Sequence, residues 1–380
     1  MIKHDATRLT PRSYYAPIPI FCIGLDKILC DLNLAAQLLL QAGACGCGRP
    51  LESLVDGCVG GFDRVAFSPV DTVLANLDNI EGNQFSAFYC SGAPCHLRTD
   101  PYGELTVTPT AIGAMNFDSG ALQAVTLYWE LQSIERREAF MADFAAKVNH
   151  QLTWDSYAVS YDRVLLRMSY YKEVVKRHVA ALSATETRSI LDLGAGTGNV
   201  AAALVSGGQR VTAIDLNRSM LERLQAKLSP NELERISIVQ QSGEQLAMWD
   251  SESFDGINIL LVLFDMACPQ QGLREAIRLL KPGGTLAITE PKSCFNMQDI
   301  LRRVEISLRE QNLYQELYGD WQRVNRANRS IDPTVRHDRL WIEDIADILR
   351  KEDFNVAGPQ DSHFGNCATV IATKPRGWRT

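Results

Sequence analysis

The sequence lacks three features, and each absence excludes a class of protein. It has no apolar run approaching the roughly 20 residues that a helix needs to cross a bilayer, so we expect no membrane span. It has no basic excess: 38 Lys and Arg face 45 Asp and Glu, a formal charge of −7, which argues against a nucleic-acid partner. We also expect no secretory leader, because Asp26, Lys27 and Asp31 interrupt the first apolar stretch, and we therefore expect a cytoplasmic protein.

What is present indicates a globular chain with two domains. Its length of 380 residues and its 46% apolar content are ordinary for such a protein. We expect an N-terminal α+β accessory domain over residues 1–145, which caps a site, recruits a substrate or makes a dimer contact, and a larger domain over residues 146–380. Apolar periodicity predicts a helix over residues 20–40 and further helical structure over residues 121–150, with short β-prone runs between them.

Seven of the ten cysteines lie in the first 95 residues. Two pairs, Cys45 with Cys47 and Cys90 with Cys95, raise the question of a zinc site. The first pair is spaced too closely for a usual zinc site, and the second is at the wide limit of the spacing. We therefore expect reduced thiols and no metal.

From about residue 187 the sequence alternates between strand and helix patterns. This alternation predicts a parallel, doubly wound sheet, and the last two strands, with only a short link between them, predict an antiparallel edge hairpin. The expected fold class is α/β, Rossmann-like, with a seven-stranded sheet. The expected strands are 189–193, 210–214, 236–240, 256–263, 285–289, 354–358 and 368–373.

The strongest local signal is a glycine-rich turn between the first of these strands and its helix. It reads Asp192-Leu193-Gly194-Ala195-Gly196-Thr197-Gly198-Asn199, and an acid, Asp215, ends the next strand 17 residues after Gly198. Glycines allow a close backbone approach to a ligand, and a carboxylate at that strand end can accept both ribose hydroxyls of an adenosine. A turn that binds no ligand is the alternative. The segment Lys281-Pro282-Gly283-Gly284, which follows in order, favours the ligand.

Residues 187–290 resemble the class I S-adenosylmethionine-dependent methyltransferase family. The resemblance implies S-adenosyl-L-methionine as cofactor, with Asp215 on its ribose and Asp192 near its ammonium group. Many small-molecule members place an acid at the adenine amino group, where this chain has Ser242; Glu244 or a backbone group is the alternative. Residues 154–162 resemble the lead-in helix of the quinone-methylating group, whose tyrosines would lie against the sulfonium or simply pack the helix onto the sheet. The implied cofactor-binding residues are Asp192, Gly194, Ala195, Gly196, Thr197, Gly198, Asn199, Asp215, Leu216, Met220, Ser242, Gly243, Glu244, Leu260, Leu261, Tyr157, Tyr161 and Tyr170.

The loop after the fourth strand carries no histidine. It reads Leu260-Leu261-Val262-Leu263-Phe264-Asp265, so Asp265 is its only ionisable candidate for a catalytic base. The alternative is that Asp265 caps the loop. The apolar loop favours a hydrophobic acceptor, or a soft nucleophile that needs little help from a base.

Residues 291–340 exceed a normal connection and predict a helical lid. Arginines recur in it at helical spacing beside aromatic residues. We expect this segment to meet the substrate, whereas a solvated helix face is the alternative reading of the arginines. The candidate substrate residues are Tyr314, Trp321, Arg323 and Arg326.

The leading hypothesis is an enzyme that methylates a small, partly hydrophobic metabolite or natural-product intermediate, and a homodimer is one expected assembly. A methyltransferase acting on a protein or a carrier-bound substrate is the second hypothesis. A catalytically inactive, cofactor-binding regulatory partner is the third.

Overall fold

The computed structural model describes residues 20–24, 29–32, 36, 70, 89–91, 95–99, 103–115, 122–183, 189–244, 246–331 and 339–377. The chain divides into two compact units, residues 1–150 and 151–380.

The described part of the first unit is an antiparallel sheet. Its order is β2-β1-β6-β5-β3, and β4 also pairs with β5. The two longest strands, β5 and β6, form a hairpin whose core residues include Leu105, Val107, Leu127 and Trp129. The strands are β1 (Ile20–Gly24), β2 (Leu29–Leu32), β3 (Tyr89–Ser91), β4 (Cys95–Thr99), β5 (Gly103–Met115) and β6 (Leu122–Ile134).

Two helix predictions for this unit were wrong. The segment expected as a helix from residue 20 contains β1 and β2, which pair with each other and with β6. Residues 122–134 form β6, and the helix α5 (Arg137–Leu165) begins only afterwards. Short apolar runs fit either structure, and strand pairing decided both cases: β1 pairs with the distant β6, whereas β6 also pairs along its length with its hairpin neighbour β5. Cys90 and Cys95 lie in β3 and β4, whereas Cys45 and Cys47 lie outside the described residues.

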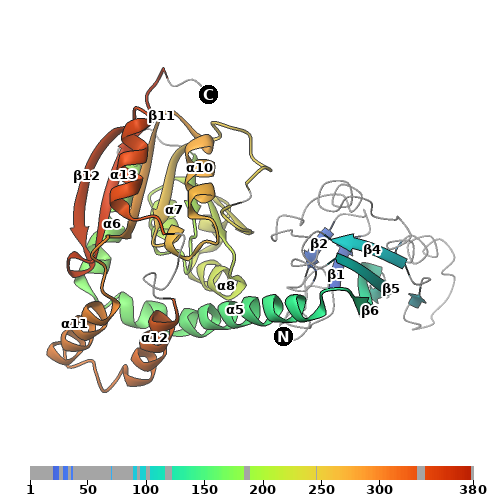
Figure 1. The fold of residues 1–380 in the computed structure, drawn as a ribbon. Helices are drawn as coiled ribbons and strands as arrows, with labels where there is room; N and C mark the ends of the chain where they lie inside the picture. The colour runs from blue at the N-terminus through green and yellow to red at the C-terminus, as the bar shows by residue number, and fades with distance from the viewer. Residues whose placement is uncertain are drawn as a thin grey trace. The chain divides into compact units, whose positions relative to one another are not determined.

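The second unit confirms the predicted α/β fold (Figure 1). Its seven-stranded sheet has the order β12-β13-β11-β10-β7-β8-β9. The five strands from β7 to β11 are parallel, and β13 is antiparallel to both β11 and β12, which is the predicted edge hairpin. The strands are β7 (Ser189–Leu193), β8 (Arg210–Asp215), β9 (Ile236–Gln240), β10 (Phe254–Leu260), β11 (Leu280–Pro291), β12 (Asn355–Ser362) and β13 (Cys367–Thr373).

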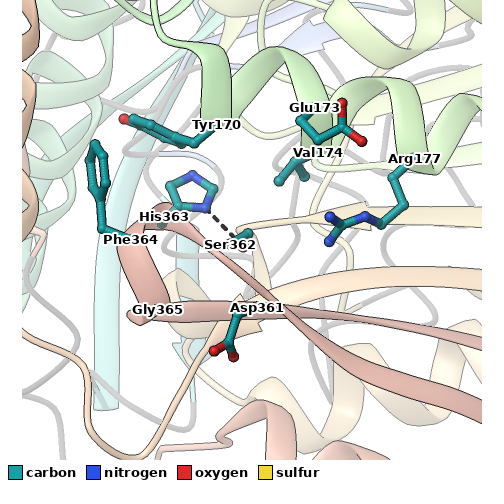
Figure 2. A pocket seen from close by; sticks show the side chains of 9 residues that line it. All are labelled: Tyr170, Glu173, Val174, Arg177, Asp361, Ser362, His363, Phe364 and Gly365. Carbon is teal, nitrogen blue, oxygen red and sulfur yellow. Dashed lines mark hydrogen bonds between the residues drawn. The ribbon is translucent and has the colours of Figure 1, made fainter.

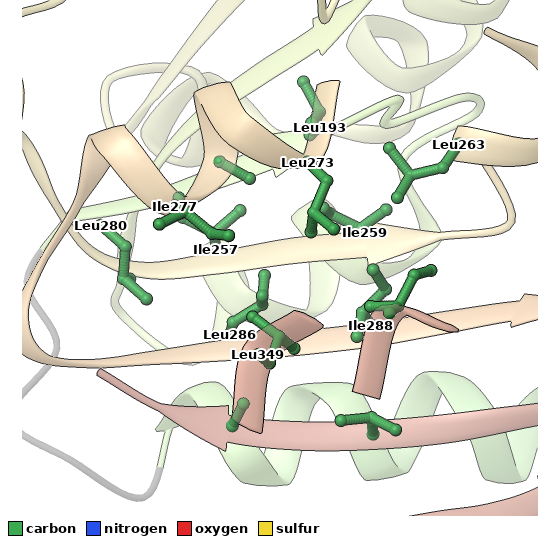
Figure 3. Close-up of a cluster of buried hydrophobic side chains, with 14 of the residues drawn as sticks. Leu193, Ile257, Ile259, Leu263, Leu273, Ile277, Leu280, Leu286, Ile288 and Leu349 are labelled. Atoms are coloured by element: carbon green, nitrogen blue, oxygen red, sulfur yellow. The ribbon is translucent and has the colours of Figure 1, made fainter. Parts of the chain in front are cut away.

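Helices bury both faces of this sheet, as its nearly continuous apolar strands require. On one face, α10 (Pro269–Leu279) and α13 (Ile342–Lys351) pack on Ile257, Ile259, Leu286 and Ile288 (Figure 3). The other face packs against α6 (Ser169–Ser183), α7 (Asn199–Ser206) and α8 (Arg218–Lys227). Because side chains alternate along a strand, Asp192, Asn258 and Thr289 are placed on the α6 face.

A separate hydrophobic cluster joins the end of α5 to α6 and to two helices inserted after β11. These are α11 (Met297–Glu310) and α12 (Tyr318–Ser330), within the segment predicted as a lid. The nearly buried Asp320 of α12 accepts a hydrogen bond from Ser160 Oγ of α5 at 2.8 Å, and its carboxylate pairs with Arg163 at 2.8 Å. The inserted helices are therefore held to α5 by apolar packing and by a shielded carboxylate.

Among the described residues, no helix is long and apolar enough to cross a membrane. The same residues contain no group of three or more potential metal ligands.

Candidate functional site

The glycine turn follows β7, and its three glycines, which occupy every second position, have left-handed backbone conformations. The φ angles are +70° at Gly194, +54° at Gly196 and +76° at Gly198. A Cβ on Gly194 would lie 2.3 Å from a methyl group of Val262, and one on Gly198 would lie 2.0 Å from Leu224 Cδ1. A Cβ on Gly196 would meet no atom within 4 Å. The outer glycines are therefore required by packing, whereas the middle one faces open space.

The end of β8 lies against this turn. Asp215 Oδ2 accepts the Gly196 N–H at 2.8 Å, and Oδ1 accepts the Asn217 N–H at 2.7 Å. Ala195 N–H donates to Ile214 O at 2.8 Å, which ties the turn to the same strand. The sequence predicted the turn and the acid separately, and the structure brings them together.

Two charged residues that were not predicted from the sequence, Asp162 and Lys227, hold the far side of the turn. Asp162 of α5 accepts hydrogen bonds from Thr197 Oγ1 at 2.8 Å and Asn199 Nδ2 at 2.9 Å. Lys227, the last residue of α8, pairs with Asp162 at 2.6 Å and donates to Thr197 O at 2.6 Å. The signal for Asp162 was its place in the segment recognised as the lead-in helix; Lys227 had no local signal.

The tyrosines of α5 and α6 form a buried aromatic column. The ring centroids of Tyr157 and Tyr161 are 4.9 Å apart, and those of Tyr161 and Tyr171 are 5.8 Å apart. Asn199 Nδ2 donates to Tyr171 Oη at 3.1 Å, which joins the column to the glycine turn. Burial raises the pKa of Tyr171 to about 12 and those of Tyr157 and Tyr161 further, so all three phenols stay neutral at pH 7.

Tyr170 points elsewhere, into a pocket of about 220 Å³ between α6 and the β12–β13 turn (Figure 2). Its ring centroid lies 4.7 Å from that of His363 and 4.8 Å from that of Phe364. Arg177 lines the other end of the pocket. Contact of Tyr170 with the cofactor stays a prediction.

The loop after β10 is organised by a buried acid that the sequence reasoning also missed. Glu290, near the end of β11, accepts the backbone N–H groups of Val262 and Leu263, both at 2.8 Å, and of Phe264 at 3.2 Å. Burial raises the pKa of Glu290 to about 7, although these hydrogen bonds act in the opposite direction. An acid directly after a buried apolar strand was the available signal.

The raised pKa of Glu290 makes stability depend on pH. The unfolded carboxyl ionises near pH 4.5 and the folded one near pH 7, so the folded state holds an extra proton between these values and its stability falls as pH rises. At about 1.4 kcal/mol per unit of pKa, this amounts to roughly 3 kcal/mol. Urea titrations would give the unfolding free energies of wild type and of Glu290→Gln at each pH. We expect the first minus the second to fall by about 3 kcal/mol between pH 4.5 and 7.5. A difference that does not change with pH would contradict the assignment.

Asp265 and the loop that contains Ser242 and Glu244 are each held by their own hydrogen bonds. Trp154 Nε1 donates to Asp265 Oδ2 at 3.0 Å. Ser242 Oγ donates to Glu244 Oε2 at 3.2 Å, and the Glu244 carboxylate also accepts the Cys268 N–H. The roles predicted for these residues stay predictions.

The four candidate substrate residues of the lid have different surroundings. Trp321 is buried in the cluster that contains Tyr157 and Met220. Arg323 pairs with Asp320 at 3.2 Å, and Tyr314 lies beneath the Arg309 guanidinium at 3.7 Å. Arg326 is exposed on α12. The structure thus brings Trp321 into one cluster with Tyr157, and a substrate role for all four residues stays a prediction.

Comparison with known proteins finds similarity to methyltransferases. Residues 191–288 match the family model described as "Methyltransferase domain". The demethylmenaquinone methyltransferase of Clavibacter sepedonicus is 34% identical over 139 residues, 36% of this chain and 56% of that protein. The ubiquinone/menaquinone biosynthesis C-methyltransferase UbiE of Bartonella quintana is 24% identical over 237 residues, 59% of this chain and 85% of that protein. A SAM-dependent methyltransferase structure from Thermotoga maritima has a TM-score of 0.39 and 17% identity, and covers 58% of this chain and 98% of that one. The chain spans little more than half the length of the first of these curated relatives.

Proposed function

We propose that this chain, which through residues 191–288 belongs to the class I S-adenosylmethionine-dependent methyltransferases, transfers a methyl group to a small, partly hydrophobic acceptor. The observation that carries the proposal is the β7 turn. Its middle glycine faces open space, and the carboxylate at the end of β8 lies directly beside it. A location in the cytoplasm, a homodimer and an accessory role for the first unit remain predictions.

The residues at this turn fit the cofactor. Asp192 Oδ2 is a buried carboxylate oxygen without a hydrogen-bond partner, which suits an ammonium group. Asp215, at the end of β8, would accept from the ribose hydroxyls. Gly196 leaves room for a ligand against the backbone. When bound, S-adenosylmethionine supplies an activated methyl group on a sulfonium sulfur. The neutral tyrosine column and the β10 loop then exclude water and orient the acceptor.

The acceptor class follows from the apolar lining. Leu260 and Phe264 pack against the cluster that holds Tyr157 and Trp321. One relative is named a demethylmenaquinone methyltransferase, and another is named for ubiquinone and menaquinone biosynthesis. An aromatic hydroquinone that carries an apolar substituent, such as a prenylated naphthohydroquinone, is therefore the acceptor we propose.

Asp265 is the proposed base where the acceptor must lose a proton. A general base contributes about 10²–10⁴ in rate. We expect Asp265→Asn to lower kcat by about 100-fold or more while the cofactor Kd stays unchanged, since asparagine retains an acceptor for Trp154. A pH–rate profile identical to that of wild type would restrict Asp265 to anchoring Trp154.

The activity itself is tested with the full chain and methyl-labelled S-adenosylmethionine. One arm contains a prenylated naphthohydroquinone and a metabolite extract, and another contains a protein extract. We expect label in the small-molecule fraction. Label only in protein would support the second hypothesis instead, and cofactor binding without transfer in any arm would indicate the inactive regulatory partner.

A further inference from the structure

Two pairs of polar side chains lie on the α6 face of the sheet, and the two members of each pair come from neighbouring strands. Asp192 of β7 is in register with Asn258 of β10, and Asn258 Nδ2 donates to Asp192 Oδ1 at 2.6 Å. Thr289 of β11 is in register with Thr369 of β13, and their hydroxyl oxygens are 2.7 Å apart. All four side chains are buried beside the apolar cluster of that face.

His178 of α6 joins the two pairs. Its Nδ1 lies 2.5 Å from Asn258 Oδ1, and its Nε2 lies 2.7 Å from Thr289 Oγ1. The ring is fully buried, and burial lowers the pKa of His178 to about 4, so the imidazole is neutral at pH 7. At the far end, Arg177 donates to Thr369 Oγ1 at 3.2 Å.

The ionised carboxylate of Asp192 determines the direction of every hydrogen bond from Asn258 to Thr369. An ionised carboxylate only accepts, so Asn258 turns its amide N–H₂ to Asp192 and its oxygen to His178. His178 must then carry its proton on Nδ1, and Nε2 accepts from Thr289, which in turn accepts from Thr369. Arg177 at the other end only donates, which agrees with this direction but does not determine it, because the Thr369 hydroxyl oxygen can accept two hydrogen bonds. The ionised Asp192 therefore determines the tautomer of His178.

We propose that His178 is a positioning residue for the cofactor, which holds the Asn258 amide so that Asp192 remains a carboxylate with Oδ1 satisfied and Oδ2 left for the cofactor's ammonium group. This inference rests on the proposed function. With the proton on Nε2, the Nδ1 lone pair would repel the Asn258 oxygen, the amide would turn over, and its oxygen would face Asp192. Asp192 would then accept a proton and could no longer pair with a cation.

Two single substitutions at position 178 distinguish a positioning role of His178 from a packing role. In His178→Asn, an amide N–H₂ can take the place of Nδ1–H and still donate to Asn258. In His178→Gln, the longer side chain reaches toward Thr289 but does not supply that donor. Thr289→Val is a third test of this hydrogen-bond series, because it removes the hydroxyl that donates to His178 Nε2 with little change in side-chain shape.

The experiment is calorimetric titration of each full-length variant with S-adenosylhomocysteine and with 5′-methylthioadenosine, which lacks the amino-acid part. We expect His178→Gln and Thr289→Val to weaken the binding of S-adenosylhomocysteine by about ten-fold and to leave the binding of 5′-methylthioadenosine unchanged. His178→Asn should retain most of the wild-type affinity for both ligands. Nitrogen-15 NMR of histidine-labelled wild type should show the His178 proton on Nδ1, assigned by its absence from His178→Asn.

A proton on Nε2 in wild type would overturn the proposal. So would an equal loss for both ligands in Thr289→Val, which indicates a purely structural role. Failure of wild type to bind either ligand would refute the proposed function instead, and the NMR result would still decide the tautomer.

Discussion

Gly196→Ala is expected to abolish cofactor binding while the protein remains folded. The φ angle of +54° lies in the left-handed region, where an alanine costs about 1–2 kcal/mol, and its Cβ would touch no protein atom within 4 Å. That methyl group would instead occupy the space through which the cofactor passes along the backbone. Calorimetry should show at least a 100-fold weaker Kd, and the thermal midpoint should fall by only a few degrees.

Two other glycines provide matched controls for this change. Gly208, in the turn after α7, also has a positive φ of +92° with no atom within 4 Å of an added Cβ, so Gly208→Ala should have a comparable stability cost and unchanged binding. Gly194→Ala would place its Cβ 2.3 Å and 2.4 Å from the two Val262 methyl groups and should lower stability by about 3 kcal/mol or more. If Gly196→Ala bound the cofactor like wild type, the proposed cofactor site would be wrong.

Asp215→Ala is expected to have the second largest effect. Its carboxylate accepts from Gly196 N–H and Asn217 N–H, and so shapes the turn before any ligand arrives. Removal eliminates two charge-assisted hydrogen bonds, each worth about 1.5–3 kcal/mol, together with the acceptor for the ribose hydroxyls. We expect the affinity for S-adenosylhomocysteine to fall by about two orders of magnitude or more in calorimetry.

Glu222→Ala on α8 serves as the control for Asp215→Ala. Glu222 is a half-exposed partner of Arg218 in an i, i+4 pair, so its loss removes one negative charge without touching the turn. Unchanged binding is expected there. An Asp215→Ala protein that binds 5′-methylthioadenosine as tightly as wild type would remove the ribose role, since that compound retains the sugar.

The sequence reasoning succeeded where the signal was local. The glycine turn, Asp215 and the strand–helix alternation of the second unit each depend on residues close together in the chain, and the structure contains all of them. It failed for residues 20–24 and 122–134, where strand pairing determined the structure, with the distant β6 for the first segment and with the hairpin partner β5 for the second. It also passed over Glu290, whose three partners come from the loop after a neighbouring strand.

By itself, the sequence determined the fold class and the place of the cofactor turn, because apolar periodicity and the conformational freedom of glycine act over a few residues. Only the tertiary structure decided which polar groups meet. Asp162 and Lys227 close on the turn from two helices, and His178 connects Asn258 to Thr289 across the sheet. The physical reason is that a buried polar group must find a partner wherever the packed chain offers one, and the sequence separation between such partners carries no periodic signal.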